Sequence, residues 1–234
     1  MRRTALKTLR SASFCLGVAL ATAQTAQSQE TRAQYPSMAP LDQYLMERGA
    51  EITLARSAAP ASISNDAEVI VFSRRGYESA AKGKNGFVCL VQRSWAAGFD
   101  DPEFWSPKPR APICLNPAAV RTYLPMIIMK TGSVLAGRSK AQVFTELNTA
   151  FDKKELRTLE AGAMGYMMSK QGYLNDRDGR WRPHLMFFVP LTDESTWGAG
   201  LPGSPLIGFK SVQERHTMFF LPLPTWSDGT PAVQ

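Results

Sequence analysis

His184-Leu-Met-Phe-Phe-Val-Pro-Leu191 returns further along the chain as His216-Thr-Met-Phe-Phe-Leu-Pro-Leu223, with six of the eight positions identical. Each stretch is apolar, rich in aromatic residues and closed by a proline, a pattern that predicts a β-strand. Because side chains alternate along a strand, the histidine, the methionine and the second phenylalanine of each stretch face one way and the first phenylalanine the other. We expect two central strands in related places of one sheet. Similar apolar surroundings explain the repeat, and a duplication is the alternative, although the flanking residues do not match.

Further strand and helix signals lie around this pair. Apolar runs predict strands at 68–72, 87–91, 164–169 and 206–209. Three helices are predicted, and the first covers 40–58. The second runs from the Asn116-Pro117 cap to about Leu124, where Pro125 breaks or kinks it. The third begins at the capping box of Ser139 and Gln142 and has an apolar face at 143–151. Strands and helices come in blocks and do not alternate regularly, so the sequence predicts an α+β fold. We expect a mainly antiparallel sheet of about five to seven strands with about three helices packed on it.

The first 23 residues predict a cleavable signal peptide. Four basic residues and no acidic one precede an apolar run at 12–21, and Ala21-Thr22-Ala23 offers the small side chains that a signal peptidase needs. The apolar run is too short for a permanent membrane-spanning helix. Arg2-Arg3 matches a twin-arginine signal only in part, so the general secretory route is the expected one. We therefore expect a periplasmic or secreted protein.

Removal of residues 1–23 defines the rest of the expected organisation. Residues 24–38, rich in Gln, Ala, Ser and Thr, predict a flexible lead-in, 39–227 a single α+β domain, and 228–234 a C-terminal tail. The formal net charge falls from +7 to +3, because four basic residues and no acidic one lie in the signal peptide. The other basic residues are scattered, which argues against nucleic acid as a partner. No later stretch is long and apolar enough to predict an integral membrane segment.

Cleavage also removes Cys15 and leaves Cys89 and Cys114 in an oxidising compartment. An even number of cysteines in an exported domain predicts a disulfide between them. Cys89 lies within the predicted strand 87–91, and the chain has no Cys-x-x-Cys motif. We therefore expect the bond to stabilise the fold and not to carry redox chemistry.

The only two histidines of the chain, His184 and His216, are the candidate catalytic residues. They open equivalent strands, so their imidazoles could approach each other and share a proton or bind a metal ion. A metal site needs three or four ligands, and spacing identifies no third one beyond the candidates Asp176, Asp178 and Glu214. We therefore expect no metal and no cofactor. The alternative is a histidine at each strand start that is hydrogen-bonded to the backbone.

Aromatic residues in the predicted loops are the second candidate site. Seven of them lie outside the predicted strands and helices: Trp95, Phe99, Phe104, Trp105, Trp181, Trp197 and Trp226. Beside carboxylates such as Asp101, rings of this kind can line a groove for a sugar, a peptide or a partner. We select Trp105, Asp101 and Trp197 as candidate ligand-binding residues. The alternative is that these rings fasten long loops to the core.

Several stretches of the chain resemble known patterns. Gly198-Ala-Gly-Leu-Pro-Gly203 has the glycine spacing of a dinucleotide site, but no strand precedes it and no helix follows it. The stretches 84–91, 112–114 and 183–188 resemble exported bacterial proteins without assigned function. That resemblance implies the same compartment and the pairing of Cys89 with Cys114, and it implies no activity.

Two classes of function follow from these residues. The expected one is an exported, soluble, non-catalytic module that binds an unknown small molecule or an envelope protein through its aromatic loops. The alternative is a metal-dependent or histidine-based hydrolase that uses His184 and His216. The two classes differ in geometry, because the enzyme needs both imidazoles close together beside a carboxylate in a cleft.

Overall fold

The computed structural model describes residues 35–232, which belong to one compact unit. Its strands are β1 (Glu68–Ser73), β2 (Gly76–Ala81), β3 (Val88–Gln92), β4 (Ala111–Leu115), β5 (Met164–Met167), β6 (His184–Pro190), β7 (Ile207–Ser211) and β8 (His216–Pro222). Its α-helices are α1 (Arg48–Arg56), α2 (Ala61–Ser64), α3 (Pro117–Thr122), α4 (Leu124–Leu135) and α5 (Lys140–Asp152). Short 3-10 helices are η1 (Leu41–Tyr44), η2 (Ser94–Ala96) and η3 (Glu194–Trp197). The predicted signal peptide, 1–23, lies outside the described residues.

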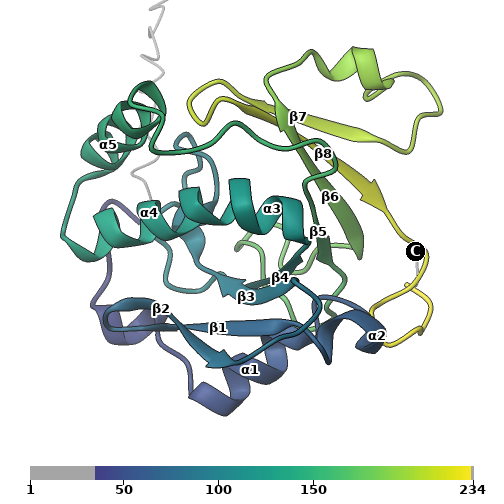
Figure 1. Cartoon of the computed structure of the whole chain (residues 1–234), viewed down its shortest axis with the longest axis horizontal. Coiled ribbons are helices and arrows are strands. Elements are labelled where there is room, and N and C mark those ends of the chain that lie inside the picture. Colours follow the sequence, from purple (N-terminus) through teal and green to yellow (C-terminus); the bar gives the residue numbers. More distant parts are fainter. Residues whose placement is uncertain (1–34, 233–234) are drawn as a thin grey trace, which may run out of the picture. The chain divides into compact units, whose positions relative to one another are not determined.

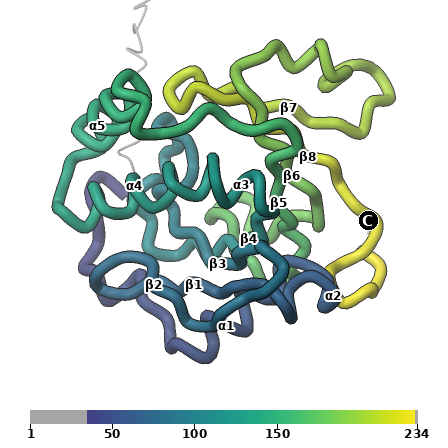
Figure 2. Tube along the Cα trace, viewed as in Figure 1, coloured from purple at the N-terminus to yellow at the C-terminus, as the bar shows by residue number. Residues whose placement is uncertain are grey.

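One sheet contains all eight strands of the described chain, in the order β2-β1-β3-β4-β5-β6-β8-β7 (Figures 1 and 2). β1 and β3 run parallel, and every other neighbouring pair is antiparallel. The α+β class is confirmed, and the sheet is close to the mainly antiparallel one expected. The expected five to seven strands and about three helices are too few, because the described chain has eight strands and five α-helices. The pattern missed β2, a partly exposed edge strand of small and polar residues, and β4, which contains Pro112. An edge strand needs few apolar residues, and a proline within a run argues against a strand.

Helices cover both faces of the first half of the sheet (Figure 1). α1 lies on one face of β1, β3 and β4, where Leu54 and Val69 belong to the same small core. α3 and α4 lie on the other face, over a larger core that includes Leu90, Ile113 and Ile127. The sheet is therefore a common wall between two separate cores.

The helix expected over 40–58 is divided in two. η1 covers its first residues, the chain is extended at Leu45, and α1 begins only after Glu47. The Glu47 carboxylate accepts hydrogen bonds from Gly49 N (2.8 Å) and Ala50 N (2.7 Å). A carboxylate that binds the first free N–H groups of a helix favours a helix start at that residue.

Two of the predicted helix starts are confirmed. Asn116 Oδ1 accepts a hydrogen bond from Ala119 N at 3.0 Å, and Ser139 and Gln142 form the expected capping box. Pro125 does not end a helix but lies in the first turn of α4, where its missing N–H leaves no helical hydrogen bond unmade. α4 was not predicted, because its apolar residues are not confined to one stripe of the helix.

The repeated stretches form β6 and β8, which are neighbours and run antiparallel. Their register pairs Phe187 with Phe219, the fourth residue of each stretch, so a local twofold relation connects the two strands. The same register pairs His184 with Pro222 at one end of the ladder and leaves His216 at the other end. The expectation of related places in one sheet is confirmed, and equivalent residues of the repeat lie at opposite ends of the ladder.

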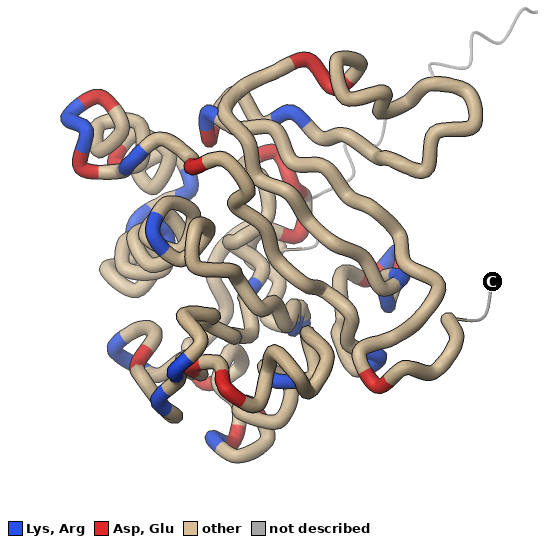
Figure 3. Tube along the Cα trace, turned by 45° about the vertical axis from the view of Figure 1, so that its right-hand side comes forward, with Lys and Arg blue, Asp and Glu red and all other residues tan. Residues whose placement is uncertain are grey.

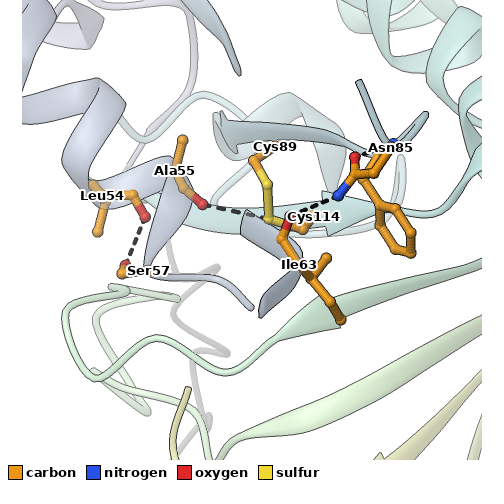
Figure 4. The surroundings of a disulfide bond; sticks show 8 residues. Leu54, Ala55, Ser57, Ile63, Asn85, Cys89 and Cys114 are labelled. Atoms are coloured by element: carbon orange, nitrogen blue, oxygen red, sulfur yellow. Dashed lines mark hydrogen bonds between the residues drawn. A yellow bond between two sulfur atoms is a disulfide. The ribbon is translucent and has the colours of Figure 1, made fainter. Parts of the chain in front are cut away.

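The predicted disulfide between Cys89 and Cys114 is present. It joins β3 to β4, whose register places the two fully buried cysteines directly opposite each other. Figure 4 shows its surroundings: Cys114 Sγ lies 3.7 Å from Ala55 O, and the Asn85 amide donates a hydrogen bond to Ile63 O at 2.8 Å. The bond therefore links two adjacent strands inside the core that α1 covers.

A buried ion pair forms a second internal link. One guanidinium nitrogen of Arg93 lies 3.0 Å from each carboxylate oxygen of Glu51, and both side chains are almost fully buried. Arg93 also donates to Tyr44 O at 2.8 Å, and Glu51 accepts from Phe72 N at 3.0 Å. These additional hydrogen bonds offset part of the free energy needed to remove both charges from water.

Both ends of the described chain are packed. Tyr35 and Met38, in the predicted flexible lead-in, pack against the core, and the Tyr35 hydroxyl donates to Asp176 at 2.6 Å. In the predicted tail, the Asp228 carboxylate accepts from Lys170 at 2.8 Å, and a short β-bridge closes a turn around it. Residues 35–38 and 228–232 are therefore held by specific contacts. The remainder of the lead-in and of the tail lies outside the described residues.

Charged residues of both signs are interspersed over the helices and loops, and the long strands of the sheet contain few of them (Figure 3). Several of these charges pair on the surface, as Arg121 does with Glu160. Exposed pairs of this kind add little to stability, because water screens them. Within residues 35–232, no helix is long and apolar enough to cross a membrane.

Candidate functional site

The two candidate catalytic histidines do not meet. His216 pairs with Pro190, six residues along β6 from His184, so roughly 20 Å separate the two positions at about 3.4 Å per residue. The sequence correctly indicated equivalent strands, and these are neighbours, but their opposite directions separate the rings. The structure therefore forms no catalytic centre that uses both imidazoles at once.

His184 lies at the start of β6 and contacts the backbone, as expected for a strand-start histidine without a catalytic role. Its Nδ1 lies 2.7 Å from Arg182 O, and its ring meets the edges of Trp181 and Phe220. Burial lowers the pKa of this imidazole. The contacts of the His184 ring are thus aromatic or to the backbone, and none of them is to a carboxylate.

His216 is almost fully buried beside a charged pair. Its Nδ1 lies 3.0 Å from Glu214 O, so this nitrogen carries the proton and Nε2 carries the lone pair in the neutral ring. Nε2 lies 3.8 Å from Glu214 Oε2 and has no hydrogen-bond partner among the described residues. Glu214 forms an ion pair with Lys130, which is only 1% exposed. Burial lowers the pKa of His216 and the Glu214 carboxylate opposes this shift, so the ring is neutral near pH 7.

The candidate metal ligands are dispersed. Among residues 35–232, no three His, Cys, Asp or Glu side chains lie close enough together to hold a metal ion. Of the candidate third ligands, Glu214 contacts Lys130, and Asp176 accepts hydrogen bonds from Tyr35 and Lys108. Asp178 lies in an exposed turn and is paired with its neighbour in the chain, Arg177.

Asp101 and Trp105, two of the three candidate ligand-binding residues, line one cavity of about 730 Å³. Its walls come from residues 35–38, from the loop 100–105 and from the turn between α4 and α5. The rings of Phe104 and Trp105 stand perpendicular to each other, with centroids 4.7 Å apart. We call this space the aromatic cavity. The third candidate, Trp197, is not among its lining residues.

The charges that line the aromatic cavity are balanced. Asp100 and Asp101 contribute two carboxylates, and Arg138 and Lys140 contribute two cations. Asp101 Oδ1 accepts from Glu103 N at 2.7 Å, and Lys140 Nζ donates to Asp101 O at 3.1 Å. Asp101 Oδ2 and both Asp100 oxygens accept no hydrogen bond from the part of the chain that the structure describes. The cavity therefore offers unused acceptors beside aromatic rings.

Most loop aromatic residues fasten loops to the core, as the alternative interpretation predicts. The buried ones, each at most 9% exposed, are Trp95, Phe99, Phe104, Trp105 and Trp181. Trp95 Nε1 donates to Thr131 Oγ1 at 3.0 Å and so ties the segment after β3 to α4. Trp197 differs, because it is 49% exposed and stacks on Phe219 with ring centroids 4.6 Å apart.

Sequence reasoning missed the cations near both candidate sites. Lys130 is a lone lysine in an apolar segment, and a charge in such a run is a signal of a buried ion pair. Its partner, Glu214, is 84 residues away, so no spacing rule connects the two. Arg138 and Lys140 lie beside the capping box of α5, where charge pattern alone assigns them only to the start of a helix.

Comparisons with known proteins give no assignment. The chain matches no protein-family model, and neither curated proteins nor solved structures gave a significant match. The function therefore has to be inferred from the residues and their geometry.

Proposed function

We propose that this protein is an exported binding module that takes a small, uncharged, polar ligand in the aromatic cavity. The observation that carries the proposal is the position of Asp101 and Trp105 on one cavity of about 730 Å³. Pockets for small ligands typically have volumes of about 300–1,000 Å³. The cavity is therefore large enough for a ligand of one or two rings.

The lining residues indicate the chemistry of this ligand. The partly exposed Tyr35 and the 9% of Trp105 that stays exposed line the cavity and offer apolar surface for one face of a ring-shaped ligand. Carboxylate oxygens of Asp100 and Asp101 accept hydrogen bonds from hydroxyl groups. Two carboxylates and two cations leave no net charge for an ionic ligand to neutralise. A neutral sugar combines an apolar ring face with hydroxyl donors, and we propose this class.

An extracytoplasmic location fits this proposal. The Cys89–Cys114 bond lies in the core, and structural disulfides persist in oxidising compartments. The basic, apolar and small-residue segments of 1–23 favour export. We therefore infer that the ligand is met in the periplasm or outside the cell.

Calorimetric titration with neutral sugars, N-acetylglucosamine and maltose among them, tests the proposed function. Asp101→Asn keeps an oxygen that can accept from Glu103 N but removes the charge, so the Kd for a bound sugar should rise about tenfold. Trp105→Phe should also weaken binding. Trp197→Phe is its matched control, since Trp197 does not line the cavity. The proposal fails if no sugar binds, or if Trp197→Phe weakens binding as much as Trp105→Phe does.

A further inference from the structure

A second cavity, of about 390 Å³, lies beside His216 and shares no lining residue with the aromatic cavity. Its walls come from the junction of α3 and α4, from the end of α5 with the segment 154–159, and from the turn between β7 and β8. Its buried lining residues form a floor and its exposed ones a mouth. We call this space the basic cavity.

The floor of the basic cavity is mostly apolar and offers no unpaired cation. Tyr123 stacks on Phe188 with ring centroids 3.7 Å apart, and Met126 and Leu156 are buried beside it. Glu214 is the acidic residue among the lining residues, and its charge is neutralised by the ion pair with buried Lys130. The neutral His216 ring completes the floor.

The mouth carries three cations, Lys154, Arg157 and Arg215. Arg215 donates to the Asp152 carboxylate at 2.7 Å, so its charge is partly satisfied. The side chains of Lys154 and Arg157 form neither a hydrogen bond nor an ion pair within residues 35–232. The Arg157 charge contributes, after the Arg121 guanidinium, to the lowered pKa of the exposed Glu160 carboxyl. The mouth therefore presents two cations whose side chains form no hydrogen bond or ion pair in the described chain.

Two of these cations lie at backbone positions that glycine usually takes. Lys154 (φ 60°) and Arg215 (φ 56°) are the non-glycine residues with positive φ in the described chain, and both line this cavity. Lys154 follows the C-terminus of α5, where its N–H bonds to Phe151 O and the next N–H bonds to Ala150 O. Glycine is favoured at this position, because a side chain strains the left-handed conformation. A lysine there is favoured by the helix dipole, and it also places a charge at the mouth.

We propose that the basic cavity binds a small organic carboxylate with an apolar body. The carboxylate group lies at the mouth between Lys154 and Arg157, and the apolar body lies against Tyr123 and Met126. The reverse orientation is disfavoured, because the floor would present to an anion the lone pair of neutral His216 and no unpaired cation. The volume lies near the lower end of the usual range for ligand pockets, so the body is a single ring or a short chain.

Titration of the purified full chain with 3-phenylpropanoate, followed by calorimetry, tests this proposal. 3-Phenylpropan-1-ol has the same apolar body without the charge, and acetate has the charge without the body. We expect 3-phenylpropanoate to bind at one site and each of these two compounds to bind at least about tenfold more weakly. Equal binding of the acid and the alcohol would overturn the proposal, as would no saturable binding of the acid at about 10 mM.

Lys154→Gly separates binding from folding. Glycine relieves the left-handed backbone, so the melting temperature should stay the same or rise, whereas the Kd for 3-phenylpropanoate should rise about tenfold. Arg157→Gln should weaken binding by a similar factor. Lys153→Gln is the matched control, because Lys153 is an exposed neighbour that does not line the cavity. If Lys153→Gln weakens binding as much as Lys154→Gly, only the general charge matters and the proposed site is refuted.

The aromatic cavity supplies an independent control. Asp101→Asn should leave the Kd for 3-phenylpropanoate unchanged, because the two cavities share no lining residue. Unchanged binding in this variant supports a separate site. A weaker affinity that matches the loss seen with Lys154→Gly would place the acid outside the basic cavity and overturn the proposal.

Discussion

Loss of the Cys89–Cys114 bond should lower the free energy of unfolding by about 3.5 kcal/mol, the value that the loop-entropy relation gives for a loop of this size at 25 °C. The loop length enters through the 25 residues of sequence that separate the two cysteines. Because β3 and β4 are paired along their whole length, the folded chain holds these residues opposite each other with or without the bond. The stabilisation therefore comes mainly from restraint of the unfolded chain.

Urea denaturation followed by tryptophan fluorescence measures this difference between oxidised and reduced protein. The double variant Cys89→Ala with Cys114→Ala should lose more than reduction does, because it also removes two fully buried sulfur atoms. Thiol titration of the unfolded oxidised protein should detect neither Cys89 nor Cys114. Two thiols from these positions before reduction would refute the bond. A loss below about 1 kcal/mol after complete reduction would refute the entropic argument.

Two further predictions concern buried ionisable groups. Arg93→Met leaves the buried Glu51 carboxylate without its cation and should lower the free energy of unfolding, measured by urea denaturation, by about 3–5 kcal/mol. Adding Glu51→Leu should restore part of this loss. A double variant no more stable than Arg93→Met would contradict the prediction. Burial holds the folded-state pKa of His216 below 6.5, so the unfolded chain takes up the proton first and stability is lost as pH falls below about 6.5. In urea denaturation between about pH 7 and pH 5, the free energy of unfolding of His216→Gln should fall less steeply with pH than that of the unchanged protein, by at most about 1.4 kcal/mol per pH unit. Equal slopes for the two proteins would refute this linkage.

Sequence patterns were sufficient where the cause of a structure lies within one element. The capping box at Ser139 starts α5, and the apolar runs of β6 and β8 are strands, because caps and side-chain alternation act over a few residues. The cysteine count, together with the predicted removal of Cys15, was sufficient for the disulfide, since the two remaining cysteines allow one pairing. Pro112 hid β4, because the missing N–H of a proline argues against a strand until a partner strand is known.

Only the tertiary structure decided which of these residues meet. The repeat at His184 and His216 indicated related strands, but their antiparallel direction follows from the chain path across the whole sheet and separates the histidines. Lys130 and Glu214 form their ion pair across 84 residues because α4 and the β7–β8 turn pack together. Residue type and periodicity report which face of an element is buried. Strand order, strand direction and the walls of a cavity depend on how all elements pack at once, and no local pattern contains that information.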